Sequence, residues 1–358
     1  MKEGNLKLVV VMVMAALVAS TAASAADKAL LIELPNQVFP SGVSSDLTVV
    51  GGLGEGGGFH WMPTSGVVFI GGRQALSTSR DGNTIVGEAL DARGLQQAAI
   101  WLRGTEWQLL GSIVPNARPC DALLSVAIQV SGDGKVVVGL AWDGCNIARA
   151  FRWEESTGMV NLGSTVAGRS SRADAVSGDG KVVVGFQELA SGFWQGARWV
   201  GGQQTLFTGP VGIVGQAFDT NGDGSLVVGQ VCRPGDLTDQ SGWVWTQQDG
   251  VQCLPVPRRR PAIEGSFLGR AQATSDDGRV IGGGHSFGLE SEAVLWLDKE
   301  PFYLKEFLRD HGVPDAFEGW VNTGTIEDIS RDGRVLVGFG AGPSDFKGYI
   351  VILPEGDK

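Results

Sequence analysis

A short motif of serine, aspartate and glycine recurs seven times along this 358-residue chain. A well-formed copy is Ser177-Gly178-Asp179-Gly180, which is followed by Val182-Val183-Val184-Gly185. The aspartates of the seven copies are Asp46, Asp81, Asp133, Asp179, Asp223, Asp277 and Asp332, and each is followed six residues later by a glycine. A repeat of this kind is interpreted before any other feature, because it means that one supersecondary unit is used many times.

The motif predicts a β-hairpin. Serine and aspartate side chains bond nearby backbone N–H groups, and glycine adopts positive φ, so Ser-x-Asp-Gly is typical of a tight turn. Strand-forming residues flank the turn, as in Val182-Val183-Val184. About twenty residues after the aspartate comes a tryptophan in six of the seven units. We expect this tryptophan to lie on a third strand and to supply apolar area for packing.

Four short strands in a unit of roughly 45 residues are typical of a β-propeller blade. The sequence therefore predicts an all-β, seven-bladed β-propeller with four-stranded blades. The last unit ends after its third strand, 349–353, whereas residues 29–34 are strand-like and precede the first unit. We expect residues 29–34 to pair with the last blade and close it, because an open blade would leave an exposed sheet edge.

The first 25 residues predict a secretory signal peptide. Lys2 and Lys7 precede an apolar run at 8–18, and Ala23-Ser24-Ala25 is typical of a cleavage site. The apolar run is too short to span a bilayer. We expect residues 26–358 to form a single propeller domain, secreted to the periplasm or the cell exterior, without a membrane anchor. The formal net charge of −11 argues against nucleic acid as a partner.

Four cysteines lie in the expected mature chain, Cys120, Cys145, Cys232 and Cys253. An even number in an oxidising compartment predicts disulfides, and four cysteines allow three pairings. We expect Cys120–Cys145 and Cys232–Cys253, because each pair then lies within one repeat unit. Their spacing does not suggest a metal site.

The repeat units differ in length mainly in the segments that connect one unit to the next. One such segment has apolar residues at helical spacing followed by Gly312, which predicts a short helix near 302–311. Connections in a meander alternate between the two ends of a sheet. The Asp-Gly turns should therefore share one face of the molecule, and the variable loops should share the other, which we call the variable-loop face. Function concentrates in loops that a rigid frame holds.

Residues 175–185, Ala-Val-Ser-Gly-Asp-Gly-Lys-Val-Val-Val-Gly, and 150–153, Ala-Phe-Arg-Trp, resemble the repeat of the secreted "HAF" extracellular repeat family. Segment 319–333 is similar to the closing unit of such proteins. The resemblance covers nearly the whole mature chain and implies a secreted, β-propeller-like protein, but it implies no activity. The chain departs from the pattern before Ala150, where Arg149 replaces the histidine that gives the repeat its name.

Candidate binding residues are those that we expect on the variable-loop face. Trp142 and Trp194 are predicted to lie in variable loops, where aromatic rings suit sugar or protein recognition, and packing onto their own blade is the alternative. His285, in a predicted loop, and His311, at the end of the predicted helix, could serve as acid or base. The candidate set is Trp142, Trp194, Arg258, Arg259, Arg260, His285, His311 and Trp320.

The segment Asp219-x-Asn221-x-Asp223-Gly224 matches the first half of a calcium loop. Gln230 replaces the bidentate glutamate that such a loop needs, and Asp223 is also the repeated turn aspartate. The turn interpretation is therefore favoured, and we expect no metal or other cofactor.

These features predict a secreted, monomeric protein that acts as a non-catalytic binding or structural scaffold for an extracellular protein or glycan. The ligand would lie on the variable-loop face or at the mouth of a central channel. The alternative is a secreted polysaccharide lyase or hydrolase that uses His285 or His311 with acidic loop residues. A histidine within hydrogen-bond reach of a carboxylate at the channel mouth would favour the enzyme.

Overall fold

The computed structural model describes residues 28–114, 123–144, 147–210, 212–232, 240–257, 268–287 and 290–355. Nearly all of the regular structure in these residues is β-strand. The one helix among them is α2 (Leu304–Asp310), which lies in the segment where the sequence predicts a helix. None of the helical structure in the described residues is long and apolar enough to cross a membrane.

The first four repeat units each form a four-stranded antiparallel meander. Their strands are β2 (Val38–Val43), β3 (Val49–Leu53), β4 (Gly58–Met62) and β5 (Gly66–Gly71); β6 (Gln74–Thr78), β7 (Thr84–Leu90), β8 (Gln96–Leu102) and β9 (Gln108–Gly111); β10 (Ser125–Val130), β11 (Val137–Trp142), β12 (Ala148–Glu154) and β13 (Gly158–Gly163); and β14 (Ser171–Val176), β15 (Val182–Glu188), β16 (Trp194–Val200) and β17 (Gln203–Leu206). A two-stranded ribbon, β18 (Thr208–Gly209) and β19 (Gly212–Ile213), follows.

The fifth and sixth units are meanders, and a single pairing of Gln230 with Arg270 joins the second strand of the fifth unit to the first strand of the sixth. Their strands are β20 (Ala217–Thr220), β21 (Leu226–Cys232), β22 (Ser241–Thr246) and β23 (Gly250–Cys253), then β24 (Leu268–Thr274), β25 (Val280–Phe287), β26 (Glu290–Leu297) and β27 (Glu300–Tyr303). The last unit supplies β28 (Asn322–Ile329), β29 (Val335–Ala341) and β30 (Phe346–Ile352), and its sheet also contains β1 (Leu30–Asn36).

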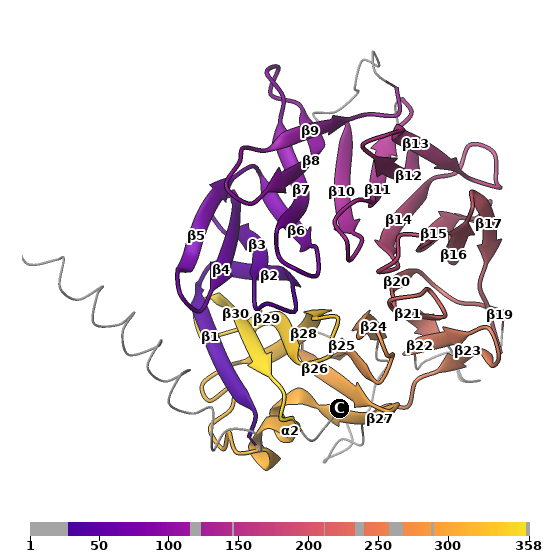
Figure 1. The fold of residues 1–358 in the computed structure, drawn as a ribbon. Coiled ribbons are helices and arrows are strands. Elements are labelled where there is room, and N and C mark those ends of the chain that lie inside the picture. Colours follow the sequence, from indigo (N-terminus) through magenta and orange to yellow (C-terminus); the bar gives the residue numbers. More distant parts are fainter. Residues whose placement is uncertain are drawn as a thin grey trace, which may run out of the picture.

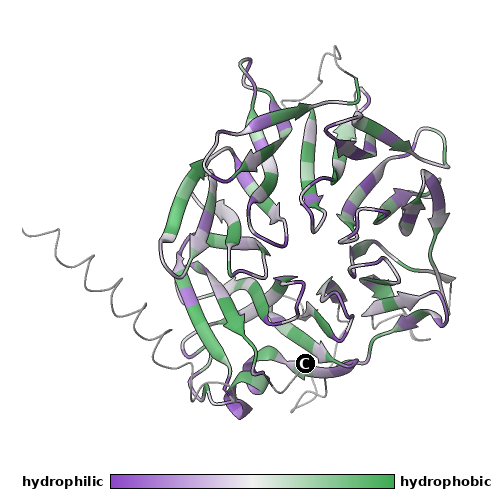
Figure 2. Ribbon diagram, viewed as in Figure 1, coloured by the Kyte–Doolittle hydropathy of each residue, from purple (hydrophilic) through white to green (hydrophobic). Residues whose placement is uncertain are grey.

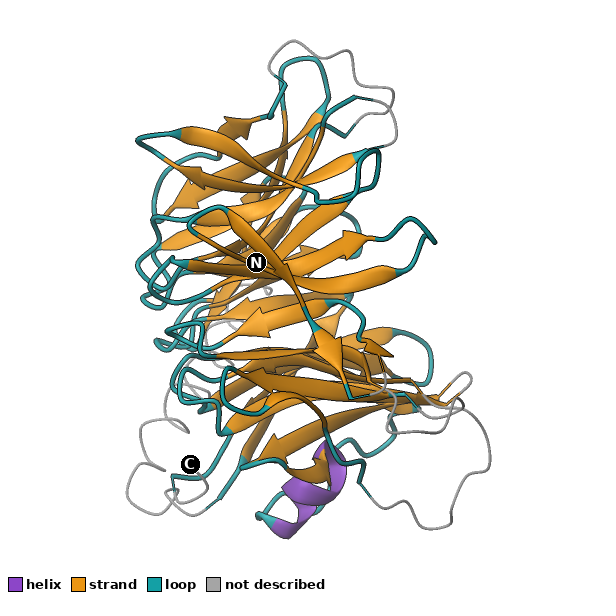
Figure 3. Ribbon diagram, turned by 90° about the vertical axis from the view of Figure 1, so that its right-hand side faces the viewer, coloured by secondary structure: helices purple, strands orange, loops and turns teal. Residues whose placement is uncertain are grey.

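The sheets are arranged around a common axis, and the first strand of each repeat unit lies nearest to that axis (Figure 1). The side view shows the strands of the sheets lying side by side, with α2 at the edge of the molecule (Figure 3). Four-stranded meanders arranged radially define an all-β, propeller-type fold.

The sheet of the last unit has the strand order β1-β30-β29-β28. In it β1 runs antiparallel to β30, with Leu30 opposite Ile352 and Leu31 opposite Val351. The N-terminal and C-terminal strands of the described chain therefore lie side by side (Figure 1).

The serine and aspartate of each motif hold the hairpin turn together. The Ser177 hydroxyl donates to Asp179 Oδ1 at 2.6 Å and accepts the backbone N–H of Val182 at 3.0 Å. Gly180 adopts φ 74°, as the motif predicts. In the fifth unit Asn221 replaces serine, and its Oδ1 accepts the N–H of Leu226 at 2.9 Å.

The glycine that closes each motif lies where two backbones nearly touch. A Cβ on Gly185 would lie 2.0 Å from the carbonyl oxygen of Arg172, so only glycine fits. The strand pairing shifts just after this point, between Ala173 and Ala175, which leaves Asp174 as a bulge residue. In the first unit the close approach is at Gly51 and not at the expected Gly52, because the turn spanned by Ser44 and Thr48 is one residue shorter than the others.

The hydrophobic core lies between neighbouring sheets. Trp199 and Trp296, on third strands, are 1% and 0% exposed. Burying such a side chain stabilises the fold by about 2–3 kcal/mol. One cluster of buried hydrophobic side chains lies between the third and fourth units, and another lies between the first unit and the last. Hydrophobic residues accordingly follow the strands, whereas hydrophilic residues gather in turns and loops (Figure 2).

Candidate binding cavity

The innermost strands carry a bulge at the same position of every repeat unit, five residues before the turn aspartate. The seven bulge residues are Ser41, Leu76, Ile128, Asp174, Phe218, Gln272 and Glu327, and all of them line one central cavity of about 630 Å³. This volume lies in the range of small-molecule sites. The bulge turns a side chain toward the axis that a regular strand would direct at a neighbouring sheet.

Further residues complete the lining. Phe39, Gln74 and Arg172 precede the bulges by two residues, and Ser77, Gln129, Asp219 and Asp328 follow them by one. Phe339 and Phe346 add aromatic surface from β29 and β30. The cavity thus combines carboxylates, amides and apolar rings, as ligand sites do.

Asp174 is a buried carboxylate at the cavity wall, with only 7% of its surface exposed. Its Oδ1 pairs with Arg172 Nε at 2.7 Å. Burial raises the pKa of Asp174 to about 6, and the charge of Arg172 opposes this shift. Gln216 is close enough to favour the charged form, but neither its Nε2 nor Asp174 Oδ2 makes a hydrogen bond of good geometry with the described residues.

Asp219 and Asp328 form a second acidic group at the cavity. The Asp219 carboxylate accepts the N–H of Thr274 at 2.9 Å and the amide of Gln129 at 3.1 Å. Burial raises the pKa of Asp328 to about 7, the neighbouring charge of Asp219 raises it further, and Arg331 opposes both effects. Burial also raises the pKa of Asp219. Two neighbouring carboxylates repel each other when both are ionised, which favours the protonated form of one of them.

Glu327 is the bulge residue beside Asp328. Burial raises its pKa to about 7, and the charge of Arg270 opposes the shift. Its negative charge contributes, after burial, to raising the pKa of Tyr349. The cavity therefore holds several acids that titrate near neutral pH.

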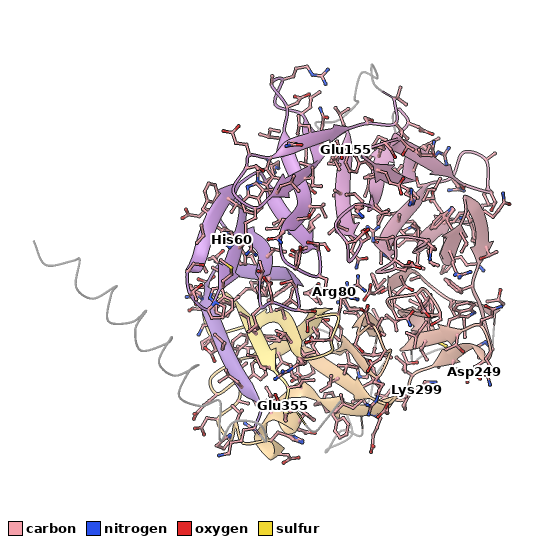
Figure 4. All side chains as sticks on the ribbon, in the orientation of Figure 1. His60, Arg80, Glu155, Asp249, Lys299 and Glu355 are labelled. Atoms are coloured by element: carbon pink, nitrogen blue, oxygen red, sulfur yellow. A yellow bond between two sulfur atoms is a disulfide. The ribbon has the colours of Figure 1, made fainter. Side chains whose placement is uncertain are left out.

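The Asp-Gly turns approach each other at one end of the axis. Arg80 N–H donates to Gly132 O at 3.1 Å, and Gly132 N–H donates to Gly178 O at 3.1 Å. The Arg80 side chain, which lies near the centre of the ring in Figure 4, forms an ion pair with Asp276. These contacts link the turns of different repeat units at that end of the axis.

The two tryptophans expected in variable loops lie instead at strand ends. Trp142 ends β11 and is half-buried. Trp194 begins β16, is 48% exposed and stacks on Phe186 with ring centroids 4.5 Å apart. The loop prediction is wrong for both, because the strands extend further than the repeat pattern indicates. Trp194 nevertheless remains exposed.

Trp320 is not an exposed ring, contrary to expectation. It is 9% exposed and packs on Phe317 and Tyr349. Its indole Nε1 donates to Glu33 Oε1 at 2.8 Å, and Lys347 lies over its ring. Trp320 thus ties β1 to the last sheet.

The two candidate histidines do not line the cavity. His285 lies within β25, not in a loop, is 0% exposed, and contacts the rings of Trp296 and Tyr303. Burial lowers the pKa of His285 to about 4. His311 caps α2, and its ring stacks on Phe307 with centroids 4.0 Å apart. Neither is placed to act on a ligand in the cavity, so the histidine-based form of the enzyme hypothesis loses its residues.

Several predicted features lie outside the described residues. These are the signal peptide, the arginines Arg258, Arg259 and Arg260, and the cysteines Cys120 and Cys145. The other predicted disulfide, Cys232–Cys253, is confirmed and joins the ends of β21 and β23.

The calcium candidate does not assemble. Asp219 faces the cavity, whereas Asn221 and Asp223 bond the backbone of their own turn through Leu226 and Ser225. Among the described residues, no group of three or more histidines, cysteines or carboxylates is placed to hold a metal ion.

Sequence reasoning missed the cavity residues. A signal for the seven bulge residues was present, since each stands five residues before a turn aspartate, and Asp174, Gln272 and Glu327 are polar residues in that position. Polar residues at one fixed position of a repeat, on the strand nearest the axis, could have indicated a shared lining.

Comparison with family models finds no match, and comparison with curated proteins finds none either. Solved structures show the same fold. The β-propeller domain of the Trilobed protease from Pyrococcus furiosus, described with an open velcro topology, has a TM-score of 0.54 at 9% identity, over 89% of this chain and 94% of that one. An oligogalacturonate lyase in complex with manganese has a TM-score of 0.50 at 13% identity, over 92% and 84%. A putative TolB from Agrobacterium tumefaciens gives 0.46 at 12% identity, over 77% and 88%. At 9% and 13% identity, the likeness to the first two structures shows a propeller fold alone.

Proposed function

We propose that this protein is a non-catalytic binding protein whose ligand enters the central cavity from the variable-loop face. The observation that carries the proposal is a contrast between two positions of the repeat. The turn residues are nearly the same in every unit, as a structural role requires. The seven bulge residues differ in every unit, from Leu76 and Phe218 to Asp174 and Glu327, and all face one cavity. A lining that varies around the ring suits the recognition of an asymmetric ligand.

The number of blades and the closure of the last blade are also part of the proposal. We count the repeat units as seven blades, and we take β1 as the strand that closes the last blade. The antiparallel pairing of β1 with β30 and the Trp320–Glu33 hydrogen bond support this closure. Secretion, membership of the HAF repeat family and a monomeric state are proposed from the sequence. The disulfide Cys232–Cys253 fits an oxidising compartment.

A binding screen with residues 26–358 tests the function. Sugars, amino acids, amines and short peptides would be added, and the shift in unfolding temperature would be measured. Ser41→Trp places an indole in the cavity, and Ser65→Trp is its matched control, because Ser65 is exposed on a turn. We expect a ligand that stabilises wild type and Ser65→Trp but not Ser41→Trp. A ligand that stabilises all three equally would place binding elsewhere and contradict the proposal.

The alternative is a polysaccharide lyase or hydrolase. The observation that favours it is the presence in one cavity of two carboxyls, Asp174 and Glu327, with pKa values raised to about 6 and about 7. Incubation with acidic and neutral oligosaccharides, followed by chromatography of the products, separates the two functions. Turnover by wild type that Glu327→Gln abolishes would favour the enzyme, whereas intact substrates favour binding without catalysis.

A further inference from the structure

Two of the seven repeat units carry a pair of aromatic residues on the hairpin between their second and third strands. The pair is Phe186 and Trp194 in the fourth unit, and Phe339 and Phe346 in the seventh. The first member stands seven residues after the turn aspartate, and the second begins the third strand. In the other five units neither position is aromatic. Because five units form their sheets without such a pair, the fold itself does not require it.

Trp194 is a fixed ring with an open side. It lies nearly flat on Phe186, with ring centroids 4.5 Å apart and ring planes 14° apart. Phe186 is 6% exposed, whereas Trp194 is 48% exposed. Pairing of Trp194 with Glu188 holds its backbone in the hairpin. Since Phe186 covers one face of the indole, the other face is available to a ligand.

The pair of the seventh unit borders the central cavity. Phe339 and Phe346 both line it, and Phe346 is 53% exposed. Phe39, another lining residue, packs edge-on against Phe339 with centroids 5.8 Å apart. The strands β16 and β30, which begin with Trp194 and Phe346, lie on opposite sides of the ring (Figure 1). Exposed aromatic rings therefore occur on two sides of the variable-loop face.

The pair of the fourth unit also adjoins the cavity. The guanidinium of Arg172, a lining residue, lies over the ring of Phe186 at 5.1 Å from its centroid. Trp194, Phe186 and Arg172 thus form a continuous stack between the exposed hairpin and the cavity wall.

Polar side chains beside the aromatic rings have hydrogen-bonding capacity to spare. Ser41 and Gln74 line the cavity and are half-buried, and neither side chain makes a hydrogen bond to the residues that the structure describes. A wholly apolar ligand would remove water from these groups without replacing its hydrogen bonds, which is unfavourable. A ligand that suits this surface has flat apolar faces and hydrogen-bonding edges.

The charge of the protein restricts the ligand further. The formal net charge is −11, and four carboxyl groups line the cavity. An anionic ligand would be repelled. The surface therefore favours a neutral compound over one that carries carboxylate, sulfate or phosphate groups.

We propose that a neutral, β-linked oligosaccharide binds across the variable-loop face, with one sugar stacked on Trp194 and another on Phe346. In β-linked glucose every ring substituent is equatorial, so both faces of the ring present C–H groups and the hydroxyls lie at the edge. The negative face of an aromatic ring attracts such C–H groups. The hydroxyls then supply donors and acceptors to groups such as Ser41 and Gln74. This inference rests on the proposed binding function and specifies its ligand class.

Titration calorimetry with cellohexaose tests the inference. Trp194→Ala and Phe346→Ala should each weaken binding about fivefold to tenfold, because each removes one stacking surface. Trp194→Phe keeps a ring and should retain most of the affinity. Phe69→Ala is the matched control, since Phe69 is 62% exposed on β5 and does not line the cavity, and it should change affinity less than about twofold. Unfolding temperatures verify that each variant is folded.

Two further saccharides test how the chain is recognised. Cellobiose is too short to occupy two separate stacking sites, so it should bind about tenfold more weakly than cellohexaose, or weaker still. Cellohexaose oxidised to a carboxylate at every C6 keeps the ring faces but is anionic, and it should also bind more weakly.

No binding of cellohexaose, or unchanged affinity in both Trp194→Ala and Phe346→Ala, overturns the inference. An equal loss of affinity in Phe69→Ala overturns it too. If no saccharide binds but an amine, amino acid or peptide stabilises wild type and is excluded by Ser41→Trp, the inference fails and the proposed function stands. If no compound shifts the unfolding of wild type, both fail.

Discussion

The carboxylate of Asp328 accepts a hydrogen bond from the backbone N–H of Val43 at 2.8 Å, across 285 residues of chain. The same relationship occurs twice more, between Asp219 and the N–H of Thr274 and between Gln129 and the N–H of Val176. In each case the acceptor stands one residue after a bulge, and the donor lies on the inner strand of the neighbouring unit. These side chains therefore connect adjacent sheets around the cavity, while the bulge residues beside them are left to face it.

Stability should depend on pH through Glu327. Its pKa is about 7 in the folded protein against 4.5 for the unperturbed side chain. The folded state thus keeps a proton that the unfolded state has lost, and the resulting stability is present below about pH 4.5 and is lost as pH rises through 7.

Glu327→Gln removes this dependence. We expect the variant to exceed wild type in free energy of unfolding by about 1–3 kcal/mol at pH 8. The difference should be much smaller at pH 5, by urea denaturation at both pH values. Glu318→Gln, on an exposed residue, should show no such pH-dependent gain. A loss of stability in Glu327→Gln at pH 8 would contradict the burial argument.

Ser177→Ala should lower the free energy of unfolding by about 1–3 kcal/mol, because the buried N–H of Val182 loses its acceptor and Asp179 loses a donor. Ser65→Ala, on an exposed turn, should stay within about 0.5 kcal/mol of wild type. Denaturant titration of both variants measures the effect. Equal results for the two serines would mean that the repeated serine is not what stabilises the turn.

Removal of the confirmed disulfide should destabilise the fold. The bond joins two cysteines that lie 21 positions apart in the sequence, and loss of such a crosslink costs about 3 kcal/mol. The double variant Cys232→Ser/Cys253→Ser should therefore unfold at lower urea concentration than wild type under non-reducing conditions. Adding reductant to the double variant tests the proposed Cys120–Cys145 disulfide, which would lower the midpoint further when reduced. An unchanged midpoint in the double variant would show that the bond adds no stability.

Trp320→Phe should lower the free energy of unfolding by about 1 kcal/mol or more, because the hydrogen bond from the indole N–H to Glu33 and part of a buried ring are lost. Trp194→Phe makes the same chemical change on a half-exposed ring and should lower the free energy of unfolding by a few tenths of a kcal/mol at most. Thermal unfolding of the two variants compares them directly. A larger effect at Trp194 would reverse the roles that burial assigns to these tryptophans.

The repeat predicts the fold well because it is local. Ser177, Asp179 and Gly180 specify a turn within a few residues, and the valines after them specify a strand, so the four-stranded sheets follow from sequence spacing. Gly51 departs from the expected register because the first turn lacks one residue, which the position of its aspartate does not reveal.

The site could not be predicted in the same way, because it depends on contacts between units. His285 and Trp320 look like loop residues in the sequence, but longer strands and the packing of the last sheet bury them. Asp174 and Glu327 look like ordinary strand residues, and only the bulge directs them toward the axis. Burial then raises their pKa values, and burial is a property of the assembled ring.

The central cavity depends on a ring in which the first and last strands of the described chain meet, and a crosslink between these strands tests the ring most directly. Leu30 and Ile352 lie opposite each other in antiparallel strands, at a separation that a disulfide can bridge. Leu30→Cys/Ile352→Cys should form an intramolecular disulfide, identified by peptide mapping of the oxidised monomer. Leu30→Cys/Lys347→Cys should not, because Lys347 pairs with Asn36 at the far end of β1. No crosslink in the first variant, or equal crosslinking in both, would contradict the closed ring and the cavity built on it.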